Sequence, residues 1–452
     1  MSQDPRVQFK QWLESGEARL QPVTLPQREL WENSPVPVAD PANHICGVIE
    51  IKGPITSGQG EAALQRVIER QEALRISFLP GKERPLQMIR ATGNAAFGFR
   101  ELRTGDVLED VMQETYRQPF DLLQGPLHRV EMIRRGTNDH VLAFAFHHAI
   151  ADGWSLGVFV QDLCTAYVMG LTGLRKAVVV GVMGLKHTLP PVTQTYSEWA
   201  AAERALWQPA ELARRAGFWK SQLAGASRIW KPPPEAAPLQ RWVSAIPADL
   251  VRGVRALAVS HSTTLFSTLL AAFQLTLSRW TGKDDILVGT PVANRNKEAV
   301  RETMGYFAGV VPLRGQIDPS RKFSGHLRAV SEAALDAFAN AMPFAELALA
   351  LGEDRTAGEH AIFDVRFALQ NHPVPDVVLS MISTKLRMRS TGTARFDLGC
   401  ELTEVGGELE IVWLFKPQRI PAAEIAELHG LFLEVLKHAT KSPESRMAAL
   451  TV

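Results

Sequence analysis

Two adjacent histidines, followed by an aspartate and a glycine, are the residues of this 452-residue chain best suited to chemistry. They lie in the run 147–153, His-His-Ala-Ile-Ala-Asp-Gly. A histidine can accept a proton from a hydroxyl or an amine near neutral pH. Asp152 can hold the turn by pairing with a cation or with backbone amides. Gly153 lets the backbone bend and can turn an N–H toward a developing oxyanion. The run therefore predicts a transfer reaction in which a histidine handles the proton.

The same run also has a purely structural interpretation, in which the histidine pair fills space at the end of a strand. Adjacent side chains in extended backbone point to opposite faces. Only one of His147 and His148 can therefore easily face the reacting groups, and periodicity does not decide which of the two it is.

A strand and a helix are expected to position this run. Residues 141–146 (VLAFAF) form an apolar stretch too short for a typical helix, and we interpret it as a buried strand. The residues after Trp154 recur with helical period. A rigid strand would then hold the histidine while amides of the following helix point into the site.

The rest of the chain continues this alternation on both sides of a proline-rich junction. We expect strands at residues 45–51, 285–291, 362–369 and 408–415, and helices at residues 61–74, 197–223, 262–280, 322–341 and 422–439. Three successive prolines at 232–234 favour an extended connector. The sequence thus predicts an α/β protein with one unit at 1–190, a second at 191–452, and a junction near 190–240.

Composition and charge exclude several classes of partner. The hydrophobic fraction of 46% and the charged fraction of 21% favour a sizeable packed core. A net charge of +1 argues against nucleic acid or an anionic membrane as the main partner. The three cysteines, Cys46, Cys164 and Cys400, are too widely spaced for a metal site or a disulfide framework. We expect them to be buried thiols in a reducing compartment, and we expect no bound metal.

One apolar stretch, at residues 177–185 (AVVVGVMGL), is far shorter than a membrane span requires. We interpret it as a buried or packing segment, with contact to a partner or a lipid surface as the alternative. The polar N-terminal sequence has no secretory signal, so a cytoplasmic location is expected.

The segment 146–155 (FHHAIADGWS) resembles the HHxxxDG signature of condensation domains of nonribosomal peptide synthetases. Some wax ester synthases and polyketide-associated acyltransferases also carry that signature. Further segments resemble other condensation-domain motifs, in order: 24–31 (TLPQRELW), 70–78 (RQEALRISF), 196–199 (YSEW), 288–295 (VGTPVANR), 304–307 (MGYF), 367–371 (FALQN) and 395–398 (RFDL). Gln71 stands where histidine is usual and Gly309 where asparagine is common, which indicates a divergent member of the family.

The resemblance implies two chloramphenicol-acetyltransferase-like halves arranged as a V-shaped pseudodimer, with the active site at their junction. It implies that His148 is the functional histidine and that Asp152 is structural and pairs with Arg295. The other members of the expected site are His147, Gly153, Trp154 and Asn371. From the residues alone, the alternatives are that Arg295 is a solvated loop charge and Asn371 a turn residue.

The resemblance also implies an acyl donor held as a thioester on the phosphopantetheine arm of a carrier protein, with no cofactor bound by the enzyme itself. No carrier attachment site or adenylation motif is visible. We therefore expect a freestanding enzyme that acts on a carrier protein in trans and releases a polyketide or peptide chain onto a free alcohol or amine. Ester formation is placed slightly ahead of amide formation. The alternatives are an acyl-CoA-dependent, wax-ester-type acyltransferase and a carrier-protein docking module without chemistry.

Overall fold

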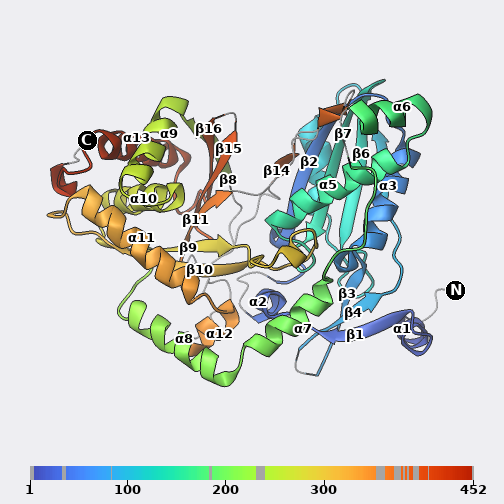
Figure 1. Ribbon diagram of the computed structural model, residues 1–452, viewed down its shortest axis with the longest axis horizontal. Coiled ribbons are helices and arrows are strands. Elements are labelled where there is room, and N and C mark those ends of the chain that lie inside the picture. Colours follow the sequence, from blue (N-terminus) through green and yellow to red (C-terminus); the bar gives the residue numbers. More distant parts are fainter. Residues whose placement is uncertain are drawn as a thin grey trace.

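Two β-sheets, each covered by helices, lie side by side in the molecule (Figure 1). The computed structural model describes residues 5–32, 37–82, 84–182, 186–230, 240–352, 362–370, 378–379, 382–383, 386–389, 396–405 and 407–449. The predicted fold class is confirmed: two α/β halves form a V, and the helices that join them run beneath both (Figure 1).

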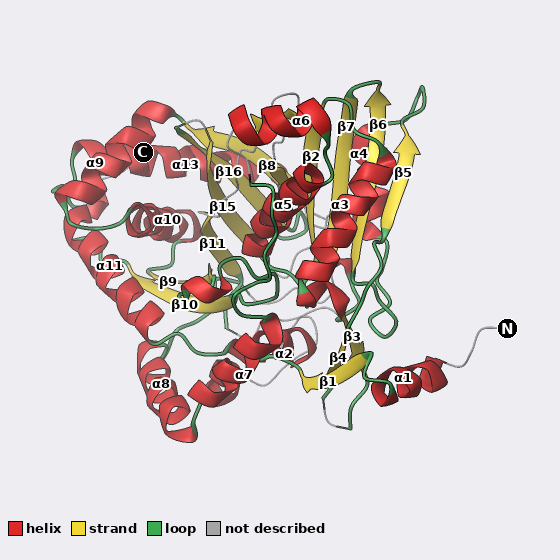
Figure 2. Ribbon diagram, turned by 45° about the vertical axis from the view of Figure 1, so that its right-hand side comes forward, coloured by secondary structure: helices red, strands yellow, loops and turns green. Residues whose placement is uncertain are grey.

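The first sheet has the strand order β14-β2-β7-β6-β5 among the described residues. Its strands are β14 (Leu386–Arg389), β2 (His44–Lys52), β7 (Asp139–His147), β6 (His128–Gly136) and β5 (Phe97–Glu101). Helices α3 (Ser57–Arg70) and α5 (Gly153–Met169) pack against each other beside this sheet, and α4 (Leu108–Arg117) packs against β2, β6 and β7. A small sheet of β1 (Ala18–Pro22), β4 (Leu86–Arg90) and β3 (Ile76–Leu79) adjoins α1 (Pro5–Glu14) and α2 (Leu25–Glu32) (Figure 2).

The second sheet has the order β10-β9-β11-β15-β16-β8. Its strands are β10 (Gly309–Gln316), β9 (Asp285–Val292), β11 (Val365–Gln370), β15 (Leu398–Val405), β16 (Glu408–Phe415) and β8 (Gln240–Ile246). The helices of this half are α9 (Ala248–Ser260), α10 (Leu265–Thr281), α11 (Phe323–Ala339), α12 (Phe344–Leu351) and α13 (Ala422–Lys441). Between the halves run α7 (Tyr196–Leu206) and α8 (Pro209–Gln222), and a short pair, β12 (Val378–Leu379) with β13 (Ile382–Ser383), completes the strands described.

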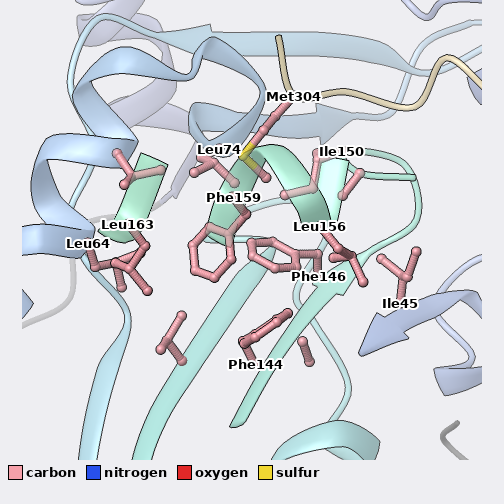
Figure 3. Packing of buried hydrophobic residues seen from close by; sticks show 14 of the residues in the cluster. Ile45, Leu64, Leu74, Phe144, Phe146, Ile150, Leu156, Phe159, Leu163 and Met304 are labelled. Carbon is pink, nitrogen blue, oxygen red and sulfur yellow. The ribbon is translucent and has the colours of Figure 1, made fainter. Parts of the chain in front are cut away.

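The core of the first half receives a contribution from the second half of the sequence. Phe144 and Phe146 of β7 contact Phe159 of α5, with ring centroids 5.0 and 4.9 Å apart. Met304 reaches this core beside Leu74 (Figure 3). Burying these side chains contributes about 1.5–3 kcal/mol each, so the segment around Met304 is tied firmly to the first half.

Strand β14 also crosses between the halves, since it pairs antiparallel with β2 of the first sheet (Figure 1). Leu386 lies opposite Ile49, and Arg389 lies opposite Cys46. The first sheet is therefore built from both parts of the chain.

Most of the predicted elements are present, and the differences lie at their ends. The strands predicted at 45–51, 285–291 and 408–415 and the helices predicted at 262–280, 322–341 and 422–439 are confirmed to within a few residues. The helix predicted at 61–74 instead begins at Ser57, because Thr56 and Gln59 form a capping box, and it ends at Arg70. A short 3-10 turn, Glu72–Arg75, follows it.

The apolar segment 177–185 is less buried than predicted. Its described part, which ends at residue 182, continues α6 (Gly173–Ala177) as a π-helix, Val178–Val182. Ala177 is exposed and Val178 is 36% exposed, while Val180 packs against the first core. The prediction of a buried segment is therefore wrong for Ala177 and Val178.

The cysteines and the helices bear on the other predictions from composition. Cys46, Cys164 and Cys400 are buried thiols, as predicted. In the part of the chain that the structure describes, no single helix is long and apolar enough to cross a membrane. Two sharply bent pairs, α9 with α10 and α11 with α12, meet the criteria of length and composition only when both helices of a pair are combined.

Candidate active site

The backbone at the end of β7 is fixed by hydrogen bonds from several elements. The N–H of His147 donates to Leu127 O at 2.9 Å, and the N–H of His148 donates to Asn43 O at 2.6 Å. The N–H of Ile150 returns to His147 O at 3.0 Å, which closes a turn directly after the strand. Movement of the turn would break these bonds and leave buried backbone groups unpaired, which costs free energy. The turn therefore has little freedom to move.

The side chain of His147 supports this turn. Its Nδ1 accepts from the N–H of Ala149 at 3.1 Å, and its Nε2 lies 2.8 Å from Val38 O. These partners assign the neutral tautomer with the proton on Nε2, which donates to Val38. His147 is fully buried. Both ring nitrogens serve the fold, so His147 is poorly placed to take part in proton transfer.

His148 lies at the boundary between the two halves. Its side chain is half-buried, and its imidazole ring packs against the ring of Tyr306, with centroids 4.7 Å apart and planes at 53°. Tyr306 comes from the segment that precedes β10 and is itself buried. The structure thus brings His148 together with an aromatic side chain from a segment far along the chain. The catalytic role of His148 stays a prediction.

Asp152 caps the helix that follows. Its Oδ1 accepts from both the N–H and the hydroxyl of Ser155, each at 2.8 Å, and its Oδ2 accepts from Phe307 N at 3.1 Å. A carboxylate at this position satisfies a free amide of the first helical turn and complements the positive end of the helix dipole. These contacts make Asp152 the N-cap of α5.

Arg295 pairs with Asp152 across the boundary. Its Nη2 donates to Asp152 Oδ1 at 3.1 Å, and its Nη1 donates to Val300 O at 2.8 Å and Thr303 O at 2.5 Å. The guanidinium lies 3.8 Å from the centroid of the Phe307 ring. Arg295 is only 4% exposed, so it is the buried partner of Asp152 rather than a solvated loop charge.

Burial and charge have opposite effects on this pair. Burial by itself would raise the pKa of Asp152, but the Arg295 guanidinium and the hydrogen bonds from Ser155 and Phe307 hold that pKa below its usual value. Burial lowers the pKa of Arg295, while Asp152 raises it. Asp152 is therefore an ionised structural anchor and not a proton donor at neutral pH.

Gly153 and Trp154 begin α5, a helix of 17 residues. The backbone N–H groups of this first turn carry the positive end of the helix dipole. The indole Nε1 of Trp154 donates to Arg301 O at 2.9 Å, which adds another bond between the halves. Asn371, the remaining member of the predicted site, lies outside the described residues.

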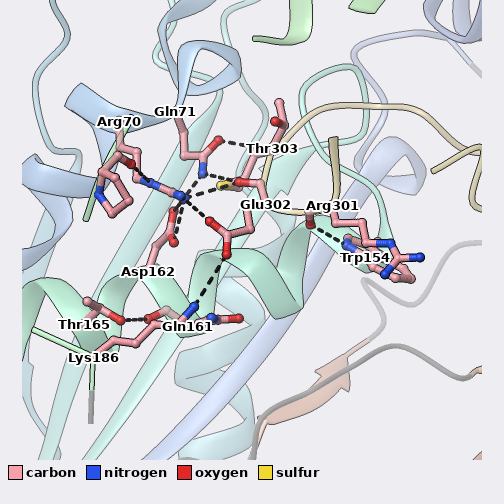
Figure 4. Close-up of polar contacts among 12 residues, drawn as sticks. Arg70, Gln71, Trp154, Gln161, Asp162, Thr165, Lys186, Arg301, Glu302 and Thr303 are labelled. Atoms are coloured by element: carbon pink, nitrogen blue, oxygen red, sulfur yellow. Dashed lines mark hydrogen bonds and ion pairs between the residues drawn. The ribbon is translucent and has the colours of Figure 1, made fainter. Parts of the chain in front are cut away.

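A polar cluster joins the halves on the side of α3 and α5 (Figure 4). Nε2 of Gln71 donates to Asp162 Oδ2 at 2.7 Å and to Glu302 O at 2.9 Å, and Gln71 Oε1 accepts from Met304 N at 2.8 Å. Arg70 bonds Asp162 at 2.8 Å and Glu302 at 2.7 Å through two different nitrogens. Burial raises the pKa of Asp162 even though Arg70 and Gln71 oppose that effect. Gln71 thus links α3, α5 and the segment before β10.

Sequence reasoning missed several residues of this site. Tyr306 was part of a recognised motif but had no expected function. Asn43, Gln71 and Tyr196 contribute through hydrogen bonds between segments far apart in the chain. A single sequence carries no signal for such pairings, although Tyr196 and Gln71 both fall within the motifs quoted above. Among the described residues, no group of three or more His, Cys, Asp and Glu side chains is arranged to hold a metal ion.

A family model and the sequences of known proteins agree on the family to which the chain is similar. The family model described as "Condensation domain" matches residues 17–452. A linear gramicidin synthase of Brevibacillus parabrevis is 29% identical over 448 residues, which are 95% of this chain but 8% of that synthase. Chondramide synthase cmdD of Chondromyces crocatus is 27% identical over 444 residues, which are 95% of this chain and 11% of that synthase. The chain therefore spans about a tenth of the length of these relatives.

Solved structures show the same fold. SgcC5 from Streptomyces globisporus aligns with a TM-score of 0.77 at 22% identity, covering 94% of this chain and all of that one. The X-domain from teicoplanin biosynthesis aligns with a TM-score of 0.80 at 20% identity, covering 95% of this chain and 97% of that one. With a family model matched over nearly its whole length, two α/β halves and the HHxxxDG run at their boundary, the chain belongs to the condensation-domain family.

Proposed function

We propose that the chain transfers an acyl group from a carrier-protein thioester to a hydroxyl or amine acceptor, with His148 as the residue that receives the acceptor's proton. One observation carries the proposal. The backbone of His148 is held by Asn43, while its half-buried ring lies at the boundary between the halves, against Tyr306. A base held in this way can be aligned with a substrate that enters between the halves.

The reaction balances without a bound metal or cofactor. The acceptor's oxygen or nitrogen attacks the thioester carbon, so a C–O or C–N bond forms and the C–S bond breaks. The acceptor's proton passes to the imidazole of His148 and then to the departing sulfur. The developing oxyanion lies near the first turn of α5, where the N–H of Gly153 and the helix dipole favour negative charge.

Asp152 takes no proton in this scheme. Its carboxylate already accepts four hydrogen bonds, two from Ser155 and one each from Arg295 and Phe307. A buried carboxylate that is fully used in this way orients the turn and the start of α5 rather than reacting. This supports His148 as the single proton acceptor of the run.

A carrier protein acting in trans is the proposed source of the donor, and a small alcohol is placed ahead of an amine as the acceptor. The SgcC5 structure contains (R)-(-)-1-(2-naphthyl)-1,2-ethanediol, a small molecule with two hydroxyl groups. By analogy of fold, this ligand of SgcC5 supports a hydroxyl acceptor for the present chain. The expected product is an ester of a polyketide or peptide chain released from its carrier.

The test uses carrier protein loaded with an acyl group, incubated with a matched alcohol and amine such as 2-phenylethanol and 2-phenylethylamine. Intact-mass measurement follows deacylation of the carrier, and chromatography identifies the product. Ester with no amide supports the hydroxyl assignment, and amide with no ester overturns it. Product from acyl-CoA but not from the loaded carrier would indicate a wax-ester-type enzyme. Binding of the carrier with no product from either donor would indicate a docking module.

The role of His148 is tested by His148→Ala, with His147→Gln as the matched variant. General acid–base catalysis contributes about 10²–10⁴-fold, so His148→Ala should lose at least about 100-fold in kcat. His147→Gln keeps a carboxamide that can bond Val38 O, and it should lose stability more than turnover. Near wild-type turnover in His148→Ala would overturn the assignment.

A further inference from the structure

A chain of buried contacts starts at the peptide that follows His148. Nε2 of Gln27 donates to Ala149 O at 2.8 Å. Gln27 Oε1 accepts from Thr24 N at 2.8 Å, and Gln27 N donates to Thr24 Oγ1 at 3.2 Å. These reciprocal bonds are a capping box at the start of α2. The backbone beside His148 is thereby tied to the end of a helix.

Tyr196, the first residue of α7, continues these contacts to the segment that precedes β10. Its hydroxyl donates to Tyr306 O at 2.9 Å and lies 3.0 Å from Thr24 Oγ1. Because the one hydroxyl proton of Tyr196 goes to Tyr306, Thr24 is the donor in the other contact. The ring of Tyr306 packs against that of His148, so the series of contacts returns to His148. Each hydrogen bond in the series has a defined donor and acceptor.

The residues that make these contacts are buried away from water. Thr24, Gln27 and Tyr196 are 0% exposed and Tyr306 is 3% exposed. The ring of Tyr196 stacks on Trp199, with centroids 5.6 Å apart and planes at 13°. Burial keeps the pKa of Tyr196 well above its usual value, so the phenol stays a donor. Hydrogen bonds in such surroundings are strong, and they hold their partners in one geometry.

We propose that Tyr196 is a positioning residue, whose hydroxyl sets the place of Tyr306 against the His148 imidazole across the boundary between the halves. Thr24 and Gln27 connect the same hydroxyl to the peptide after His148. Both the peptide after His148 and the ring contact of His148 with Tyr306 therefore depend on the position of the Tyr196 hydroxyl oxygen. For turnover the inference rests on the proposed function, but the relative position of the two rings can be measured without substrate.

The test compares Tyr196→Phe with Tyr116→Phe. Each change removes a buried phenol that donates to a backbone carbonyl, Tyr306 O in one case and Gly47 O at 3.3 Å in the other. The protein is labelled at histidine Cε1, and the NMR signal of His148 is assigned by its absence in His148→Gln. Because the ring current of Tyr306 acts on His148, that signal should shift in Tyr196→Phe and stay in place in Tyr116→Phe.

Kinetics complete the test. In Tyr196→Phe, kcat should fall at least tenfold while KM for the loaded carrier changes less than twofold, and both values should stay near wild type in Tyr116→Phe. Wild-type kcat together with an unmoved His148 signal would overturn the inference, as would a loss of kcat with that signal unmoved. A shifted signal in a protein whose wild type transfers no acyl group would support the positioning and contradict the proposed function instead.

If Tyr196→Phe does not fold, two variants of Thr24 replace it. Thr24→Val removes the hydroxyl that donates to Tyr196, and Thr24→Ser keeps it. A shift of the His148 signal in the valine variant alone supports the inference. Equal behaviour of the two variants overturns it.

Discussion

Arg295 and Asp152 form a buried ion pair whose partners come from opposite halves of the molecule. Removing one partner of such a pair leaves an uncompensated charge and costs about 3–5 kcal/mol. Asp152→Asn should therefore lower the free energy of unfolding by about that amount in urea titrations. Glu14→Gln, which breaks the exposed pair Lys10–Glu14, is the control and should cost below about 1 kcal/mol. Equal effects of the two changes would show that the buried pair contributes little.

The stability contributed by Asp152 should depend on pH with a defined sign. Burial would raise its pKa in the folded protein, but Arg295 and the hydrogen bonds outweigh burial and lower it. Its contribution is therefore complete above the unfolded value of about 3.9 and is lost as pH falls through the lower, folded value. The difference in unfolding free energy between wild type and Asp152→Asn should be constant from pH 5 to 7 and shrink below about pH 4. A difference that grows as pH falls would contradict this assignment.

Gly305 leaves room for Tyr196. A Cβ at this position would lie 2.3 Å from Cδ2 of the Tyr196 ring. Gly305→Ala should therefore displace that ring and destabilise the protein by about 1–3 kcal/mol, the usual cost of overpacking. Gly325→Ala, at an exposed position of α11 with open space around it, should instead be neutral or stabilising by up to about 1 kcal/mol. Thermal unfolding of the two variants checks the difference, and similar unfolding midpoints would count against it.

Gln71 connects the halves through its carboxamide. Gln71→Leu keeps most of the volume but removes the partners of Met304 N and of Asp162. A buried polar group without a partner costs about 1–3 kcal/mol, so the free energy of unfolding should fall by at least that amount. Gln124→Leu, at an exposed position, is the control and should change stability by less than about 0.5 kcal/mol. Matching values for the two variants would show that the link is not structural.

The sequence was sufficient to predict the elements around the histidine run because their signals are local. The buried strand before His147 follows from a short apolar run and the helix after Trp154 from helical periodicity, and β7 and α5 match them. The ends of elements were harder to predict where a cap decides them, as at Thr56. The pairing of Asp152 with Arg295 came from family resemblance, since no local pattern relates residues so far apart.

The contacts of Gln27 show where prediction from residues ends. Gln27 falls within the segment 24–31 quoted above, and its side chain is fully buried. Its bond to Ala149 O depends on the fold bringing α2 beside the end of β7, which periodicity does not specify. The prediction of burial was wrong at Ala177 and Val178 for a related reason. Hydrophobicity alone does not determine whether a neighbouring element covers a side chain.

The pairing of β14 with β2 has a consequence for synthesis of the chain on the ribosome. Until residues 386–389 emerge, β2 pairs with β7 on one side only, and its other edge is open at the segment 46–49, Cys-Gly-Val-Ile. Open apolar edges of this kind invite pairing with other chains. The nascent first half thus carries an aggregation-prone edge through most of translation, and fragments that end before β14 should require a chaperone or added β14 peptide to stay monomeric.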